Sequence, residues 1–328
     1  MNFQAKINKQ GYFLIAEIGN NHGGSIKTAK KMIYEAHNSG ADAVKLQYIL
    51  PENLVHPSEK LRVNQLKKLC LTKKEIVELF RYSKKKKIQL FASIFDIYEL
   101  SFFNKFQKFF KIASGDNNFD EMFNRISKFK KPTFISTGFL SEKEVKNLNL
   151  KIFKYWDKKF AKNNICIMHC ISKYPTDQKD LNLLFINKMS DNFIKGFSDH
   201  SIGIDACLAA NILGAKVIEK HFTLNKRNIK FRDHQLSSDP KELLDLKKQL
   251  DKNQILLGKK IKKVSKSEIK EKKKSRRGLV AKIKIKKNQI IRSNDLKYLR
   301  PERKKSLENF FKIINKKSRK SYSENEYL

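Results

Sequence analysis

The feature that most constrains the fold is an alternation of short apolar runs and helical segments along most of the chain. The runs are rich in Ile, Phe, Val and Ala, which is typical of strands buried on both faces of a parallel sheet. Helical spacing is found at 25–38, 73–86, 120–129 and 240–253, and Ser141 with Glu144 has the pattern of a capping box. The eight apolar runs lie at 13–19, 42–48, 88–95, 109–114, 132–138, 165–170, 193–199 and 217–222. Eight strand–helix units predict an α/β fold, a (β/α)8 TIM barrel.

A doubly wound sheet is the alternative for such an alternation. That fold usually carries a G-x-G-x-x-G turn after its first strand, where a dinucleotide phosphate binds. Residues 19–24 read GNNHGG at this position, which does not match. The barrel is therefore the favoured fold.

The composition changes after the last helical segment. We predict a catalytic barrel over 1–257, a Lys-rich linker over 258–274, and a small β-rich domain over 275–328. The last prediction rests on short alternating segments separated by turn residues.

The charge balance is strongly basic, with 71 Lys and Arg residues against 33 Asp and Glu residues and a net charge of +38. Such a balance can indicate a nucleic-acid or anionic membrane partner. Here the lysines are spread along the chain and no nucleic-acid-binding motif accompanies them, so we interpret the excess as a compositional bias and expect neither partner. No apolar run approaches the roughly 18 to 20 residues of a membrane span. The four cysteines form no CxxC pair, which favours a reducing, cytoplasmic location.

Polar side chains follow each of the eight apolar runs. In a TIM barrel the carboxyl ends of the strands form the active-site face, so we expect these side chains to converge. Any one of them is weak evidence, but eight strands in succession with such ends indicate a site. In chain order they are Glu17, Lys45, Gln47, Ser93, Lys111, Ser114, Asp116, Ser136, His169, Ser172, Tyr174, Ser198, His200, Glu219 and His221.

The residue types in this set indicate two kinds of chemistry. Lys45 and Lys111, together with the hydroxyls of Ser93, Ser114, Ser136 and Ser198, are typical of a site for a phosphorylated anion. Histidines at the ends of neighbouring strands, expected about 5 Å apart, could bind a divalent metal that polarises a carbonyl. Two unrelated histidines near loop ends would give the same local pattern. The carboxylates Glu17, Asp116, Glu219 and Asp233 are available for proton transfer or for binding sugar hydroxyls.

The motifs AEIGNNHGG, AVKLQ, KIASGD, ISTG, HCISKYPT, GFSDHSIG and IEKHFTL occur in this order. Together they resemble the sialic acid synthase family, the N-acetylneuraminate synthases and their nonulosonate relatives. The segment RRGLVAKIKIKKNQIIRSNDLKYLRP resembles the C-terminal SAF (antifreeze-like) domain of that family. The resemblance covers nearly the whole chain, from about residue 13 to the end.

The resemblance implies an N-acetylneuraminate synthase that condenses phosphoenolpyruvate with N-acetylmannosamine and releases phosphate. It implies a divalent metal, Mn²⁺ or alternatively Mg²⁺ or Co²⁺, held by His200 and His221, and a domain-swapped homodimer. It also implies that, of Ser198 and Glu219, one points to phosphate and the other to the sugar. The implied catalytic residues are Glu17, Glu219 and Asp116; the implied phosphoenolpyruvate ligands are Lys45, Ser93, Lys111, Ser114, Ser136, Ser172 and Ser198; the implied sugar ligands are Gln47, Tyr174, Asp233 and Arg300.

The chain departs from the family pattern on the substrate side. Asp116 replaces a common Glu, and Ser172 stands where Asn is frequent. The loop after His221 is one residue longer than usual and reads FRDH at 231–234 where PGPDH is common, and Glu302 follows Arg300-Pro301 where Gly is usual. A legionaminate or pseudaminate synthase that acts on another N-acetylated hexose is therefore an open alternative. A catalytically inactive, polyanion-binding barrel is a third reading, against which the intact His200 and His221 argue.

Overall fold

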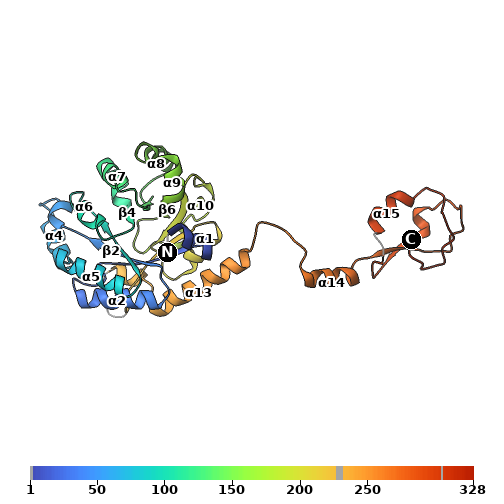
Figure 1. Cartoon of the computed structure of the whole chain (residues 1–328), viewed down its shortest axis with the longest axis horizontal. Helices are drawn as coiled ribbons and strands as arrows, with labels where there is room; N and C mark the ends of the chain where they lie inside the picture. Colours follow the sequence, from blue (N-terminus) through green and yellow to red (C-terminus); the bar gives the residue numbers. More distant parts are fainter. Residues whose placement is uncertain (1–2, 227–231, 304–305) are drawn as a thin grey trace. The chain divides into compact units, whose positions relative to one another are not determined.

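The computed structural model describes residues 3–226, 232–303 and 306–328, and eight parallel strands close into a barrel within it (Figure 1). Each strand pairs with the next one along the chain, and β8 pairs with β1 to close the ring. The strands are β1 (Phe13–Gly19), β2 (Ala43–Tyr48), β3 (Gln89–Ile94), β4 (Phe110–Ile112), β5 (Thr133–Ser136), β6 (Ile165–Cys170), β7 (Ile194–Asp199) and β8 (Val217–His221). The prediction of a TIM barrel, with its eight strands in this order, is confirmed.

Helices follow the strands and surround the barrel (Figure 1). Helix α2 (Ile26–Asn38) buries Ala29, Met32, Ile33 and Ala36, which share one face, so the apolar spacing decides how the helix packs. The capping box of Ser141 and Glu144 is formed at the start of α8 (Glu142–Tyr155). The further helices around the strands are α3 (Pro51–Leu54), α4 (Lys60–Lys67), α5 (Lys73–Lys85), α6 (Leu100–Asn104), α7 (Asp120–Ser127), α9 (Lys158–Asn164), α10 (Phe185–Lys188), α11 (Asp205–Ile212), α12 (Arg232–Leu236) and α13 (Pro240–Leu257), with 3-10 turns at Ser114–Asp116 and Gln178–Asp180.

An aromatic cluster fills the amino-terminal end of the barrel. Helix α1 (Phe3–Gln10), which the sequence analysis did not predict, contributes Phe3 to it. The ring of Phe3 lies 5.1 Å from that of Phe13 and 5.4 Å from that of Phe134, and both contacts are edge-on, the geometry that aromatic pairs favour. Phe91 and Phe109 complete the cluster. This end of the barrel is therefore a packed apolar core.

The chain divides into two compact units, Met1–Gly258 and Lys259–Leu328. The second unit contains α14 (Lys266–Ser275), β9 (Gly278–Ala281), a 3-10 turn at Ser293–Asp295, β10 (Leu296–Leu299) and α15 (Ser306–Ile313). Strand β9 pairs antiparallel with β10, and bridges such as Val280 to Tyr327 add further β-type contacts around a small apolar core. The segment interpreted as a linker contains α14, whose first turn is capped by Ser265 and Glu268 and which buries none of its residues.

Among the parts of the chain that the structure describes, no helix combines the length and the apolar character that crossing a bilayer requires.

Candidate active site

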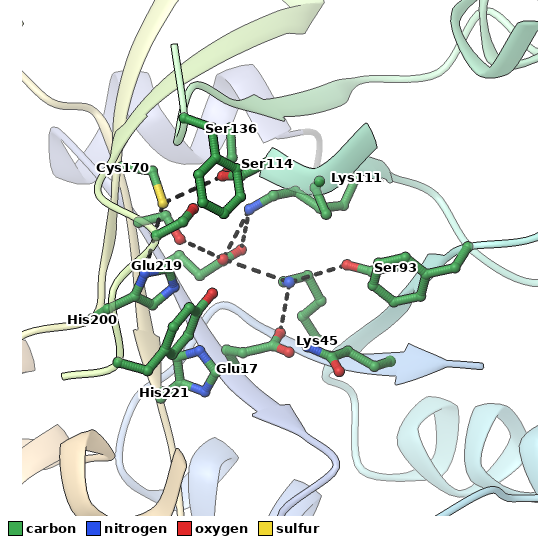
Figure 2. A pocket seen from close by; sticks show the side chains of 18 residues that line it. Glu17, Lys45, Ser93, Lys111, Ser114, Ser136, Cys170, His200, Glu219 and His221 are labelled. Atoms are coloured by element: carbon green, nitrogen blue, oxygen red, sulfur yellow. Dashed lines mark hydrogen bonds and ion pairs between the residues drawn. The ribbon is translucent and has the colours of Figure 1, made fainter. Parts of the chain in front are cut away.

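A pocket of about 190 Å³ opens at the carboxyl ends of the strands (Figure 2). All eight strands, or the turns that directly follow them, contribute to its wall, as the position of the active-site face in this fold requires. The sequence-predicted residues that line it are Glu17, Lys45, Gln47, Ser93, Lys111, Ser114, Ser136, Ser172, Tyr174, Ser198, His200, Glu219 and His221. The barrel therefore brings most of the predicted set into one cavity.

Two buried lysines both approach the carboxylate of Glu219 in the pocket (Figure 2). The Nζ atom of Lys111 lies 2.8 Å and 3.0 Å from the two carboxylate oxygens of Glu219. Lys45 Nζ lies 2.9 Å from Glu17 Oε2 and 3.5 Å from Glu219 Oε1, and it donates to Ser93 Oγ at 3.1 Å. Two cations and two carboxylates thus form one buried network.

The hydroxyl of Ser198 donates to Glu219 Oε1 at 2.9 Å, so both residues face the lysines. The expectation that one of them points to phosphate and the other to the sugar stays a prediction. Their shared orientation follows from the strand register: Ser198 and Glu219 are direct partners on β7 and β8, so their inward side chains lie side by side. The positive charge of Lys111 then draws the Glu219 carboxylate toward the same part of the pocket.

The two carboxylates of this network have opposite pKa shifts. Burial raises the pKa of Glu17 to about 7, although Lys45 opposes the shift, and the neighbouring charge of Glu219 adds to it. For Glu219 burial also favours the neutral form, but Lys111 and Lys45 outweigh it and hold the pKa of this carboxyl well below its usual range. Paired groups whose pKa values are driven apart are typical of an acid–base group beside a permanent charge. Glu17 can therefore exchange a proton near neutral pH, while Glu219 stays ionised.

The structure places His200 and His221 next to each other at the ends of β7 and β8, with ring centroids 5.4 Å apart (Figure 2). His200 Nδ1 lies 2.7 Å from the carbonyl oxygen of Ile171. An N–H at Nδ1 donating to that carbonyl leaves Nε2 with a free lone pair, which is how metal-binding histidines are usually oriented. The Nδ1 atom of His221 is buried without a hydrogen-bond partner, and burial together with His200 keeps the pKa of His221 well below its usual range. His221 is thereby kept neutral and can offer a lone pair to a cation. For His200 burial favours the neutral form, but Cys170 outweighs it and raises the pKa, so this imidazole offers a second lone pair once it is deprotonated.

These two histidines fit the donor set of a two-ligand metal site. Around them the described residues include no group of three or more His, Cys, Asp or Glu side chains that could hold an ion. Further ligands would therefore have to come from substrate or water. A site that leaves coordination positions open is what Lewis-acid catalysis requires.

Four residues named from the sequence lie elsewhere. His169 faces away from the pocket: its Nε2 lies 2.7 Å from Leu181 O and its ring packs on Phe197, while the next residue, Cys170, lines the pocket. Asp116 is partly buried in the turn after β4 but does not line the pocket. Asp233 lies in the adjoining hollow, and Arg300 belongs to the second unit. Phe231 of the FRDH segment lies outside the described residues.

Sequence reasoning also missed residues that the pocket uses. Cys170 Sγ lies 3.8 Å from His200 Nδ1 and 3.6 Å from Ser114 Oγ, and Phe95 and Phe139 add apolar walls. Strand β6 is buried on both faces, so its sequence has no alternation to show whether His169 or Cys170 faces inward.

A second hollow of about 350 Å³ adjoins the pocket and shares Gln47, Phe95 and Tyr174 with it. Its polar side chains are Asn20, Arg62 and Asp233, together with the shared amide of Gln47 and hydroxyl of Tyr174. The rest of its wall is apolar and is made by Ile49, Leu54, Val55 and Leu66. The hollow can hold the part of a substrate that extends from the histidines.

Comparison with known proteins agrees with the class that this fold and site define. Residues 32–262 match the NeuB family. The chain is 36% identical to the N,N'-diacetyllegionaminic acid synthase of Campylobacter jejuni, over 96% of this chain and 98% of that protein. It is 35% identical to a pseudaminic acid synthase of the same species, over 69% of each chain. The crystal structure of the N-acetylneuraminic acid synthetase of Leptospira borgpetersenii, in complex with citrate, superposes with a TM-score of 0.73 and 32% identity, over 79% of this chain and 90% of that one.

The barrel with its lysine, carboxylate and histidine pocket is thus that of an enzyme. The chain belongs to the NeuB family, the sialic acid synthase family of nonulosonate synthases.

Proposed function

We propose that this protein condenses phosphoenolpyruvate with an N-acetylated hexosamine in a metal-dependent reaction that releases phosphate. The observation that carries the proposal is the arrangement of Lys45 and Lys111, two buried cations, beside the paired imidazoles of His200 and His221. Glu17 and Glu219 already pair with these two cations, and a bound phosphate group would share them, since lysine ammonium groups are typical ligands of phosphorylated anions. An anion subsite next to a carbonyl-polarising centre is what this condensation needs.

The hydroxyls around the lysines support the anion subsite. Ser136 Oγ and Ser172 Oγ are buried and have no hydrogen-bond partner in the structure, so each has a donor to offer to a bound ligand. Ser93 and Ser198 already contact Lys45 and Glu219, respectively. We propose that phosphoenolpyruvate binds here through Lys45, Lys111 and the hydroxyls of Ser93, Ser114, Ser136, Ser172 and Ser198.

In the proposed reaction, C3 of phosphoenolpyruvate forms a bond to the aldehyde carbon of the open-chain sugar. Water adds to C2, the bond from C2 to the phosphate oxygen breaks, and phosphate leaves. When bound to His200 and His221, a divalent ion, which we propose to be Mn²⁺ in preference to Mg²⁺ or Co²⁺, supplies a Lewis acid for the carbonyl. Glu17, with a pKa of about 7, is placed to exchange the protons of water and of the new hydroxyl. Glu219 holds Lys45 and Lys111 in position as a permanent anion.

The sugar is proposed to extend from the histidines past Gln47 and Tyr174 into the adjoining hollow. N-acetylmannosamine, which gives N-acetylneuraminate, is the first candidate. The apolar wall of Ile49, Leu54, Val55 and Leu66 favours a second one, because a hydroxymethyl end would lose its hydrogen bonds against such a surface. A 6-deoxy sugar with a second acetamido group, as a legionaminate-type synthase would use, fits this wall better, and the full-length similarity to the C. jejuni enzyme supports it.

The test is a substrate panel with the purified full-length protein, Mn²⁺ and phosphoenolpyruvate. Phosphate release and mass spectrometry of the product should show condensation with N-acetylmannosamine, with a 2,4-diacetamido-2,4,6-trideoxyhexose, or with both. The ratio of the kcat/KM values decides between the two sugars. Absence of phosphate release with every N-acetylated hexose would overturn the proposed reaction.

We also propose that the second unit is an SAF domain that acts across a domain-swapped homodimer, with Arg300 reaching the partner subunit's sugar site. The resemblance of the segment around Arg300 to that domain supports this proposal. Mixing an Arg300→Ala subunit with a His221→Ala subunit should restore activity if each active site uses residues of both chains. Two inactive homodimers that stay inactive after exchange of subunits would contradict the arrangement.

A further inference from the structure

A buried ion pair lies directly behind the two histidines, on the outer side of the barrel wall. Asp199 and Lys220 are register partners on β7 and β8, and each is the residue immediately before a histidine. Their side chains are both 0% exposed, and Lys220 Nζ lies 2.7 Å from Asp199 Oδ2. Neither residue lines the pocket, because alternate side chains of a strand point to opposite faces. No step of the proposed reaction uses them.

Hydrogen bonds extend this pair to the residue that follows His200. Asp199 Oδ1 accepts from the backbone N–H of Ser201 at 2.8 Å and from its hydroxyl at 2.7 Å. Lys220 Nζ donates to the carbonyl oxygen of Ser201 at 2.5 Å. His200 thus stands between two residues of one network, and His221 follows the third. The network ties the backbone on both sides of His200 to the backbone just before His221.

The energetics of burial indicate that this network contributes geometry more than stability. Two charges removed from water lose hydration that their mutual attraction barely offsets, and an apolar pair of similar volume is often equally stable or more stable. The pair also contacts α11, where the buried Cys207 donates from Sγ to Asp199 Oδ2 at 3.3 Å, and Ile218, two residues before Lys220 in β8, is a buried apolar residue. Charged partners with fixed hydrogen-bond directions instead specify one relative position of the two strand ends.

We propose that Asp199, Ser201 and Lys220 are positioning residues that fix the separation and orientation of the His200 and His221 imidazoles. The pair is thereby preorganised to share one divalent cation. The identity of that cation, though not the positioning itself, rests on the proposed function. Outer residues that orient metal-binding histidines typically change metal affinity by 10- to 100-fold when they are replaced.

The decisive variant is the double substitution Asp199→Asn and Lys220→Met in the full-length protein. It removes both charges at nearly constant volume and keeps an oxygen acceptor for Ser201. Tyr12→Phe is the control, because it removes the partly buried hydrogen bond from Tyr12 to Asp251 Oδ1 (2.6 Å) at the other end of the barrel. Ser201→Ala, which removes one donor and no charge, is a milder variant at the same site.

Mn²⁺ binding is measured by isothermal titration calorimetry and the midpoint of thermal unfolding by circular dichroism. We expect the double variant to fold and to bind Mn²⁺ at least tenfold more weakly, Ser201→Ala to show a smaller loss, and Tyr12→Phe to keep wild-type affinity even if its midpoint falls. Affinity of the double variant within twofold of wild type would overturn the proposal. Failure of the double variant to fold would also overturn it, because the pair would then be a requirement for stability.

A second readout separates this proposal from the proposed function. Nitrogen-15 NMR of the histidine side chains, recorded without metal, reports on the hydrogen bonding and local environment of each imidazole nitrogen. We expect the signals of His200 and His221 to shift in the double variant and to stay unchanged in Tyr12→Phe. If the wild type binds no Mn²⁺, the metal role fails, but the NMR signals still test whether Asp199, Ser201 and Lys220 position the two imidazoles. Unchanged signals of His200 and His221 in the double variant would overturn the positioning role.

Discussion

The two ends of the barrel interior are filled by different kinds of side chains, aromatic ones at the amino-terminal end and charged or polar ones at the carboxyl end. At the amino-terminal end, the rings of Phe3, Phe13, Phe91, Phe109 and Phe134 pack together in a buried hydrophobic cluster. At the carboxyl end, the interior is filled by lysines, carboxylates, hydroxyls and imidazoles. The strands that connect the ends are the same, so a few residues along each strand separate a packed core from a reactive pocket.

This difference indicates that one end of the barrel mainly stabilises the fold and the other mainly forms the pocket. Apolar burial stabilises the barrel in proportion to the area removed from water, and the amino-terminal end supplies such area. The carboxyl end contributes buried ions that cost hydration and that a bound ligand would use. Changes at the first end should therefore affect unfolding and changes at the second should affect turnover. The predictions below test that separation.

The largest effect on turnover is expected for His221→Ala. Loss of one of two imidazoles leaves a single protein ligand for the ion, so turnover should fall to background while the unfolding midpoint stays near that of wild type. Phosphate release at saturating Mn²⁺ and both substrates measures the first, and thermal unfolding the second. His37→Ala, at the last turn of α2, is the histidine control. Wild-type turnover of His221→Ala would show that the metal assignment is wrong.

The reverse pattern is expected for Phe109→Ala at the amino-terminal end. Its ring is buried and contacts Phe3, Phe13, Phe91 and Phe134. Truncation of a buried aromatic leaves a cavity and should lower the free energy of unfolding by about 3–5 kcal/mol. Urea unfolding measures this loss, and Leu150→Ala, an exposed apolar residue, should change it by less than about 0.5 kcal/mol. If kcat of Phe109→Ala falls under conditions where the variant is still folded, the two ends of the barrel do not have separate effects on unfolding and turnover.

A smaller effect on substrate binding is expected for Lys111→Ala. The loss of one charge-assisted contact to phosphoenolpyruvate is worth about 1.5–3 kcal/mol, so KM for phosphoenolpyruvate should rise by roughly 10- to 150-fold. KM for the sugar should change much less. Lys131→Ala is the matched lysine, since Lys131 donates to the carbonyl of Gln107 (2.8 Å) before β5 begins and lies outside the pocket. Equal effects of the two substitutions would argue against an anion subsite at Lys111.

The barrel could be predicted from the sequence because each strand is a short apolar run and the long helices α2, α5, α8 and α13 have helical spacing and a side-chain cap. The convergence of the polar residues followed from the fold, since all eight strands are parallel and end on one face. Orientation within a strand could not be predicted: β6 is buried throughout, so His169 and Cys170 look equivalent in sequence. The ion pairs of Glu219 and of Asp199 with Lys220 depend on the register between strands, which a single sequence does not contain. Helix α14 had a usable signal in Ser265 and Glu268, a capping box within the Lys-rich segment.

The smallest effect tests the boundary of the reactive end at Asp116, which the family resemblance makes catalytic but which does not line the pocket. Burial raises the pKa of Asp116 from 3.8 to about 6, so between these values the folded protein binds the proton more tightly than the unfolded chain does. Its contribution to stability is therefore complete below about pH 4 and is lost as the pH rises through about 6. Asp116→Asn should not show this loss. Relative to wild type, its free energy of unfolding should therefore be about 1–3 kcal/mol more favourable at pH 7.5 than at pH 4, as measured by urea unfolding at both pH values. Turnover of Asp116→Asn at pH 7.5 should be retained if the reaction uses only residues that line the pocket. A fall of a hundredfold or more would show that Asp116, in the turn after β4, also contributes to turnover.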